Sequence, residues 1–536
     1  MNRLPCIAAG LIILGSLVVG VSPSSGDAAT PALDAEAISL PLGLLWKFSS
    51  VDVGKELPAR NIPTAPVVSG DTVYVCARGM TAENVPTTSV YALSLETGEK
   101  LWDHVLEGTV FGTPALADDT LWVSDSQGYL YALDVRNQGR ERSRFQLGTS
   151  SRCSPVVHDG VVYVGDDGGL VLAVDAKALQ EKWRFQAKGQ VKAPIAVSPE
   201  NKYVYVSSGE PRLHVLHMAT GTEAWNYPMP EVSMESAPVL WDRYLYIASG
   251  KRLICITASQ GRYQWDSMRM GITTGYPIIG TPTLAPDEKG KEARLYFCCE
   301  DGTVYAVNAR TGRLAWKAPV KLDRVATCAP TVTRDAVLIG AQNGLLYAVS
   351  ANEGSKLLWK YRAVPPADIT AQTTAVSIAS SPVVSDGRVL VLADEGTLLC
   401  FSPAAVDVAP PEVKDLKVRD VAIESQTPVY GMPPLPFTAT IVDEGSGIDE
   451  SKIVFKLDGE VVPHQFVART GELFYKTPVT RPIRPLADGV HTISITVADW
   501  MGNTLTREWV FRVDHRRIPV PKVQDSPAAN PDAINF

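Results

Sequence analysis

A repeat of about 45 residues is the feature that most constrains how this chain can fold. Each repeat starts with a small residue and a proline, passes through two alternating strands such as VYV, and ends with a turn and an aromatic residue. The repeat prolines lie 48, 41, 39, 44, 44, 48 and 52 residues apart; they are Pro66, Pro114, Pro155, Pro194, Pro238, Pro282, Pro330 and Pro382. This period, with four short strands per repeat and no helical pattern, predicts an all-β, eight-bladed β-propeller over residues 43–403.

The stretch from Gly302 to Trp316, GTVYAVNARTGRLAW, is the clearest example of the repeat. Its first half alternates along a strand, so successive side chains are expected on opposite faces of a sheet. Asn308 can bond the backbone two residues on, and Gly312 can take a positive φ, which together predict a turn. We therefore interpret the stretch as a β-hairpin of the sixth blade, without catalytic residues.

The aromatic residue that ends each repeat occurs seven times, six times as tryptophan and once as Phe145, which is once fewer than the proline. The eighth repeat runs from Phe401 into SPAAVDVAPPEV without a turn or a tryptophan, whereas LLWKF at 44–48 precedes the first repeat proline. Because unpaired sheet edges invite aggregation, we expect residues 45–48 to form the outer strand of the last blade. The tryptophans expected to pack between blades as structural staples are Trp46, Trp102, Trp183, Trp225, Trp265, Trp316 and Trp359.

A second domain is predicted after residue 403. A linker is expected at 404–412, and single strands separated by polar turns follow at 413–514. The Asp458-Gly459 pair within KIVFKLDGEVV predicts a tight hairpin turn. About 100 residues of such strands suit an antiparallel β-sandwich. The tail at 515–536 is rich in proline, asparagine and alanine, a composition that favours disorder.

Two sets of motifs resemble known families. YALSLETGEKLW and YAVNARTGRLAW resemble the tryptophan-docking repeat of pyrroloquinoline-quinone-like (PQQ-like) propellers, over roughly residues 43–401. That superfamily includes quinone-dependent alcohol dehydrogenases and non-enzymatic members such as the outer-membrane assembly lipoprotein, so the resemblance implies a fold and leaves the function open. DEGSGIDESKIVFKLDG and DGVHTISITVADWMGN are similar to bacterial immunoglobulin-like domains of exported proteins.

The N-terminus indicates export. Residues 1–28 have the order of a signal peptide: Arg3, an apolar run from Ile7 to Val21, and a small polar segment. The run is short for a membrane span, which favours cleavage after Ala28 over an uncleaved anchor. Cys6 precedes the run, whereas a lipoprotein cysteine would follow it. We therefore expect a periplasmic or secreted protein with no membrane span after cleavage.

Charge and cysteine content narrow the function classes. Fifty basic and 58 acidic residues give a net charge of −8, which disfavours nucleic acid as a partner. The mature chain keeps seven of eight cysteines, an odd number, so at least one should be unpaired. Adjacent Cys298 and Cys299 could form the vicinal disulfide that the dehydrogenase resemblance implies, or point to opposite faces of a strand as unbonded thiols. Cys153 and Cys328 fall on facing blades and are expected to be unbonded.

Two groups of polar residues are candidate binding sites. Arg152, Lys192 and Glu235 lie just before repeat prolines and are expected at the mouth of the propeller channel, facing either a ligand or only water.

The second group lies in loops of the second domain: Asp443 and Asp449 flank a Gly-Ser-Gly turn, and Asp499 and Asn503 share another loop. Such oxygen atoms suit Ca²⁺ if the loops meet, and are otherwise merely solvated.

Two functions are compatible with these observations. The first is an exported, non-enzymatic scaffold without cofactor, whose partners are envelope or extracellular proteins or glycans. The alternative is a periplasmic PQQ-dependent dehydrogenase. The repeats are nearly filled by four strands and their turns, which leaves little loop for a cofactor cage. No convincing set of Glu, Asn and Asp for the calcium ion of such an enzyme is evident either, so the sequence favours the scaffold.

Overall fold

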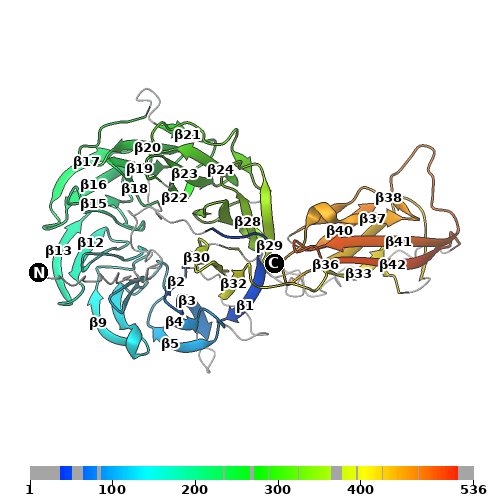
Figure 1. Ribbon diagram of the computed structural model, residues 1–536, viewed down its shortest axis with the longest axis horizontal. Coiled ribbons are helices and arrows are strands. Elements are labelled where there is room, and N and C mark those ends of the chain that lie inside the picture. The colour runs from blue at the N-terminus through cyan, green and yellow to red at the C-terminus, as the bar shows by residue number, and fades with distance from the viewer. Residues whose placement is uncertain are drawn as a thin grey trace, which may run out of the picture.

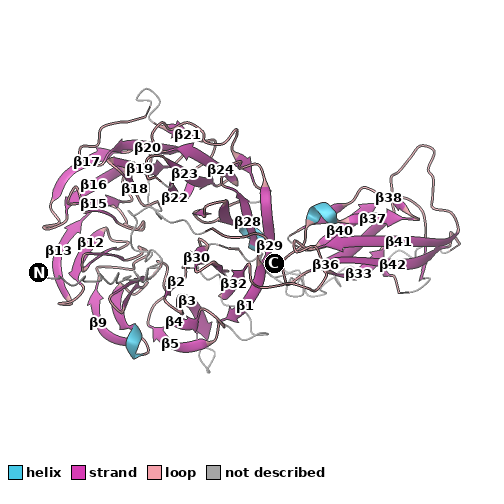
Figure 2. Ribbon diagram, in the orientation of Figure 1, coloured by secondary structure: helices cyan, strands magenta, loops and turns pink. Residues whose placement is uncertain are grey.

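The computed structural model describes residues 37–50, 64–80, 86–232, 236–265, 271–287, 289–323, 325–363, 377–378, 380–393, 396–424, 427–468 and 470–516. The predicted signal peptide and the tail beyond residue 516 lie outside these ranges. The described chain forms a ring of sheets with a second β-unit beside it (Figure 1). Strands dominate both parts (Figure 2).

Eight four-stranded antiparallel sheets form the ring, which confirms the predicted eight-bladed propeller. Blades 1 to 4 run from inner to outer strand in chain order: β2 (Val67–Ser69), β3 (Thr72–Met80), β4 (Pro86–Ser94), β5 (Lys100–Leu106); β6 (Ala115–Ala117), β7 (Thr120–Ser124), β8 (Tyr129–Asp134), β9 (Arg140–Gln146); β10 (Val156–His158), β11 (Val161–Gly165), β12 (Leu170–Asp175), β13 (Gln180–Gln186); β14 (Ala196–Ser198), β15 (Tyr203–Ser207), β16 (Arg212–His217), β17 (Glu223–Pro228).

Blades 5 to 8 follow the same order, except that the outer strand of blade 8 comes from the N-terminal side of the chain. They are β18 (Val239–Trp241), β19 (Tyr244–Ser249), β20 (Arg252–Thr257), β21 (Ile272–Thr273); β22 (Ile278–Pro286), β23 (Ala293–Cys299), β24 (Thr303–Asn308), β25 (Val320–Lys321); β26 (Thr331–Val332), β27 (Ala336–Gly340), β28 (Leu345–Ser350), β29 (Leu357–Arg362); β30 (Val383–Ser385), β31 (Arg388–Leu392), β32 (Thr397–Ser402), β1 (Gly43–Ser49).

The middle strands of the blades are buried on both faces. In β11, Val162, Tyr163 and Val164 are each at most 1% exposed. One apolar cluster joins side chains of blades 2, 3 and 4. Each blade is covered on both sides by its neighbours, so apolar residues are stabilising at every position of a middle strand.

The predicted closure of the ring is confirmed. β1 pairs antiparallel with β32, from Gly43 opposite Ser402 to Ser49 opposite Thr397. Trp46 of β1 is 9% exposed and lies in one apolar cluster with side chains of blades 1 and 8. The first described strand of the chain thus completes the last blade and removes the open edge of β32.

In six of the eight blades a glycine in the turn after the third strand packs on the tryptophan of the preceding blade. A Cβ atom on Gly98 would lie 2.5 Å from the Trp46 ring, so only glycine fits there. The pairs are Gly98–Trp46, Gly139–Trp102, Gly221–Trp183, Gly261–Trp225, Gly312–Trp265 and Gly354–Trp316. Several of the indoles also donate to a carbonyl that follows the third strand of the next blade: Trp46 to Leu95 (2.9 Å), Trp183 to Met218 (2.8 Å), Trp265 to Ala309 (3.0 Å) and Trp316 to Ala351 (2.8 Å).

The outer strands of blades 5 and 6 differ from those of the other blades. Trp102 and Trp359 lie within the outer strands β5 and β29, whereas Trp265 and Trp316 precede the two-residue strands β21 and β25. In blade 6 the reason is Pro319, which lacks the N–H that a sheet ladder needs and lies between Trp316 and β25.

The second unit is a sandwich of two five-stranded sheets. One sheet has the order β34 (Val421–Ala422), β33 (Glu412–Val418), β36 (Pro436–Val442), β40 (Glu472–Lys476), β39 (Gln465–Val467); the other has β35 (Thr427–Val429), β42 (Thr504–Val513), β41 (Gly489–Ala498), β37 (Val454–Leu457), β38 (Glu460–Val461). Phe437, Phe455 and Phe511 are fully buried between the sheets. The Asp458-Gly459 turn joins β37 to β38 as predicted. The kinship of this unit with immunoglobulin-like domains stays a prediction.

Short 3₁₀ helices complete the described structure: η1 (Val135–Asn137), η2 (Gln342–Gly344) and η4 (Glu450–Lys452). Among the described residues, no helix is long and apolar enough to cross a membrane.

Candidate functional site

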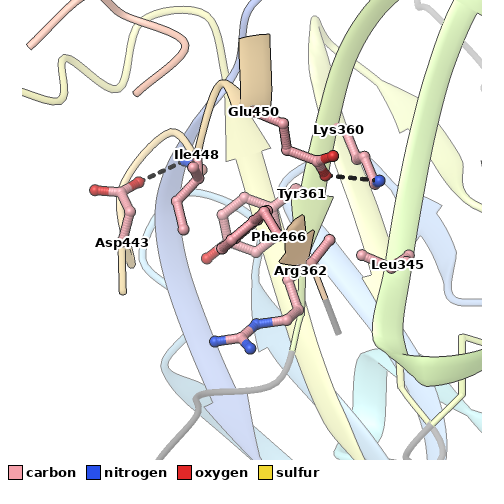
Figure 3. A pocket seen from close by; sticks show the side chains of 10 residues that line it. Leu345, Lys360, Tyr361, Arg362, Asp443, Ile448, Glu450 and Phe466 are labelled. Atoms are coloured by element: carbon pink, nitrogen blue, oxygen red, sulfur yellow. Dashed lines mark hydrogen bonds and ion pairs between the residues drawn. The ribbon is translucent and has the colours of Figure 1, made fainter. Parts of the chain in front are cut away.

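A small cavity lies at the seam between blade 7 and the second unit (Figure 3). Its volume is about 30 Å³, and its lining residues are Leu345, Lys360, Tyr361, Arg362, Asp443, Gly447, Ile448, Glu450, Phe466 and Ala468. That is room for water, whereas cavities that bind organic ligands usually measure about 300–1,000 Å³. The seam is therefore of interest for its charged groups.

Basic residues of β29 face the seam. Lys360, whose side chain is 9% exposed, forms ion pairs with Glu450 of the second unit (2.8 Å) and with Asp323 of the propeller (3.3 Å). Burial lowers the pKa of Arg362 to about 10. In Figure 3 its guanidinium points away from Glu450. The Lys360–Glu450 pair is thus a charged contact between the two parts of the chain.

Three carboxylates from separate segments meet next to this seam. Asp407 comes from the segment after β32, Asp443 follows β36, and Asp499 lies between β41 and β42; their ligand atoms all lie within 4.8 Å of one another. Asp499 is 2% exposed and accepts hydrogen bonds from Asn503. Burial, with the negative charges of Asp407 and Asp499, raises the pKa of Asp443 to about 6.

The structure places only part of the calcium group named from the sequence in this cluster. Asp443 and Asp499 meet, and the Asn503 amide bonds both Asp499 and the Asp407 carbonyl. Asp449 instead caps η4 and accepts from Ser451. Sequence reasoning missed Asp407, because it stands alone in a predicted linker with no ligand motif around it.

Calcium binding by this cluster stays a prediction with a direct test. If Asp407, Asp443 and Asp499 hold Ca²⁺, millimolar Ca²⁺ should raise the melting temperature of the purified protein, and EDTA should reverse the rise. Mg²⁺ should raise it less, because it demands a tighter octahedral shell. Equal melting curves with Ca²⁺ and with EDTA would argue for a cluster that is only hydrogen-bonded.

Without a divalent cation, the raised pKa of Asp443 predicts lower stability at higher pH. An unfolded aspartate titrates near 3.9, so between about pH 4 and 6 the folded state binds more protons and the free energy of unfolding falls as pH rises. Asp443→Asn is expected to remove this fall and to stabilise the protein by about 1–2 kcal/mol at pH 7.5. Urea unfolding at pH 5 and 7.5 in EDTA measures the effect. Asp449→Asn, outside the cluster, should keep the pH dependence of the wild type.

The residues predicted at the channel mouth are only partly described. Arg152 is exposed, lies over the Phe111 ring at 5.3 Å and pairs with Asp167 at 3.2 Å. Lys192 is half-buried, and Glu235 lies outside the described residues. Their role as a binding site stays a prediction.

The described cysteines are all free and buried. Cys298 and Cys299 belong to two different apolar clusters, as alternation along β23 requires, so they do not form the vicinal disulfide considered above. Cys153 and Cys328 are also unbonded, as expected.

The propeller matches a known family. The family model described as outer membrane protein assembly factor BamB matches residues 44–142, 135–200 and 183–404. The chain is 23% identical to BamB of Moranella endobia (strain PCIT) over 334 residues, which cover 57% of this chain and 80% of that protein. It is 21% identical to BamB of Burkholderia pseudomallei (strain K96243) over 413 residues, which cover 75% of this chain and all of that protein.

A quinoprotein is also similar. Quinohemoprotein alcohol dehydrogenase of Comamonas testosteroni is 25% identical over 299 residues, 48% of this chain and 39% of that enzyme. The crystal structure of the quinohemoprotein alcohol dehydrogenase from that organism superposes with a TM-score of 0.55 at 14% identity, covering 76% of this chain and 84% of that chain, which is a likeness of fold. Since the family model spans well over half of the residues, this chain belongs to the family of outer membrane protein assembly factor BamB.

Proposed function

We propose that this protein is an exported, non-enzymatic scaffold that binds other proteins of the bacterial envelope during outer-membrane protein assembly. The observation that supports this function most is that the segments between blades are short. In blades 1 to 4, short segments join the outer strand of one blade to the inner strand of the next, as between β9 and β10 or between β13 and β14. These four blades offer a rigid surface and little loop for a cofactor cage.

The names of the relatives add support. BamB of Moranella endobia and of Burkholderia pseudomallei are named as outer membrane protein assembly factors. A role in assembly also agrees with the export signal predicted at residues 1–28. Glycans and extracellular proteins remain partners that the test below can reveal.

The alternative, a PQQ-dependent dehydrogenase, has one observation in its favour, the similarity to quinohemoprotein alcohol dehydrogenase. The thiols at the position singled out for a cofactor-covering disulfide do not fit that role, because Cys298 and Cys299 face opposite sides of β23. We therefore place the scaffold first.

Site-specific photo-crosslinking in the native envelope tests the scaffold. Leu101 and Val105 of the outer strand β5 are 55% and 54% exposed, so a photoreactive residue at either position should leave the fold intact. We expect adducts with outer-membrane assembly proteins, identified by mass spectrometry. Val461, 67% exposed on the second unit, serves as the comparison position. Absence of such adducts from all three positions would contradict the proposal.

Reconstitution tests the alternative on the same preparation. Purified protein is mixed with PQQ and Ca²⁺, and bound quinone is followed by absorbance together with dye-coupled alcohol oxidation. The scaffold predicts no stoichiometric quinone and no oxidation. Tight quinone binding with turnover would establish the dehydrogenase instead.

A further inference from the structure

The last blade lacks the turn that covers a tryptophan. In six blade pairs the turn after the third strand places its glycine on the indole of the preceding blade. Blade 8 has no such turn, because its outer strand β1 comes from the other end of the propeller and the chain leaves the ring after β32. The propeller itself therefore supplies no covering glycine for Trp359 of blade 7.

A loop of the second unit occupies that position. The Trp359 Nε1–H donates to the Ser446 carbonyl at 2.9 Å, the same type of bond that other indoles make to the next blade. The Tyr361 hydroxyl donates to the Glu444 carbonyl at 3.0 Å, and the Leu44 N–H donates to the Gly445 carbonyl at 3.2 Å. Three consecutive carbonyls of one loop thus accept bonds from blades 7 and 8.

Further contacts surround these bonds. Trp359 is fully buried, and Trp500 of the second unit packs against the same apolar cluster. The ion pair between Lys360 and Glu450 flanks the loop at 2.8 Å. Gly447 lies so close to β29 that a Cβ atom would sit 3.0 Å from the Lys360 carbonyl oxygen.

We propose that Trp359 and the adjoining face of β29 form a docking site whose occupant is the loop 443–447 of the second unit. This loop replaces the missing turn of blade 8, and its contacts with blades 7 and 8 hold the two parts of the chain together even when the linker 404–412 is cut. The second unit is then attached to blades 7 and 8 by non-covalent contacts, and these contacts fix the position of its far end relative to the propeller. This inference does not depend on the proposed function.

Cutting the linker in the folded protein tests this docking. Residues 408–410 are exposed, so a protease site inserted after Ala409 should be accessible. After complete cleavage of the full-length protein, we expect the two fragments to co-elute in gel filtration at micromolar concentration. Fragments of the wild type that separate would overturn the proposal.

Two glycines give a matched pair of variants. Gly447 and Gly459 have nearly the same φ, +86° and +82°, so valine strains both backbones alike. At Gly459 nothing lies within 4 Å of the new Cβ atom, whereas at Gly447 it meets β29. Gly447→Val is expected to weaken association of the cleaved fragments roughly tenfold or more, and Gly459→Val to leave it unchanged.

A variant on the propeller side leaves the loop sequence unchanged, so its effect cannot come from local misfolding of the loop. Trp359→Phe keeps an aromatic ring in the site but removes the N–H donor to Ser446. We expect measurably faster dissociation of the cleaved fragments, with the circular dichroism spectrum unchanged. Equal affinities for the wild type, Gly447→Val and Trp359→Phe would show that other contacts hold the second unit and would refute the docking site.

Discussion

Trp46→Ala is expected to lower the free energy of unfolding by about 3–5 kcal/mol, as large-to-small substitutions of buried aromatic residues do. Trp46 is 9% exposed and donates its N–H to the Leu95 carbonyl, and Gly98 packs against its ring. All these contacts join the closing strand β1 to blade 1. Their loss should loosen the one blade whose strands come from both ends of the propeller, and free the edge of β32.

Denaturant unfolding followed by far-ultraviolet circular dichroism measures this loss. The matched control is Leu45→Ala on the same strand, where the side chain is 39% exposed; we expect a change below about 1 kcal/mol. Aggregation on storage should increase for the tryptophan variant alone. Similar losses for both variants would mean that β1 contributes only its backbone pairing to closure.

Asp166→Ala should be comparably destabilising, by about 2–4 kcal/mol, since it leaves several backbone N–H groups without an acceptor. Asp166 is 1% exposed and accepts from the N–H groups of Thr149 (2.8 Å), Gly168 (2.9 Å) and Leu170 (2.7 Å). It thereby shapes the turn that presents Asp167 to Arg152.

Thermal and urea unfolding test this role, with Glu181→Ala in the same blade as control. Glu181 is in a surface ion pair with Arg184, so its loss should change the free energy of unfolding by less than about 1 kcal/mol. Asp166→Asn should be intermediate, because an amide oxygen can still accept some of the three bonds. A wild-type melting curve for Asp166→Ala would rule out the role assigned to this carboxylate.

The sequence predicted the propeller well because its information is local. The strands of blades 1 to 7 each lie within one repeat, and counting the repeat aromatic residues is enough to identify Trp46 as the missing eighth. The two-residue strands β21 and β25 were not foreseen, since a tryptophan marks a position in the blade without fixing where the sheet ladder resumes.

The seam could not be predicted, because its contacts join residues far apart in the chain. Trp359 and Ser446 are separated by 87 positions, and no sequence pattern around either residue predicts that the two are in contact. The same holds for Asp407, which acquires its neighbours Asp443 and Asp499 only when the second unit docks. The acidic loops themselves were visible in the sequence, but their meeting depends on tertiary structure.

The pairing of β1 with β32 also sets an order of folding. It joins residues 43–49 to residues 397–402, so it is a contact of very high sequence separation, whereas the strands of blades 1 to 7 pair within their own repeats. Contacts of this kind form slowly, since a long loop must close first. A chain that emerges from its N-terminus must therefore keep β1 unpaired until the last blade has appeared. During this interval the apolar side chains of β1, GLLWKFS, and the edge of β32 both lack their partner, which is the condition in which sheet edges aggregate.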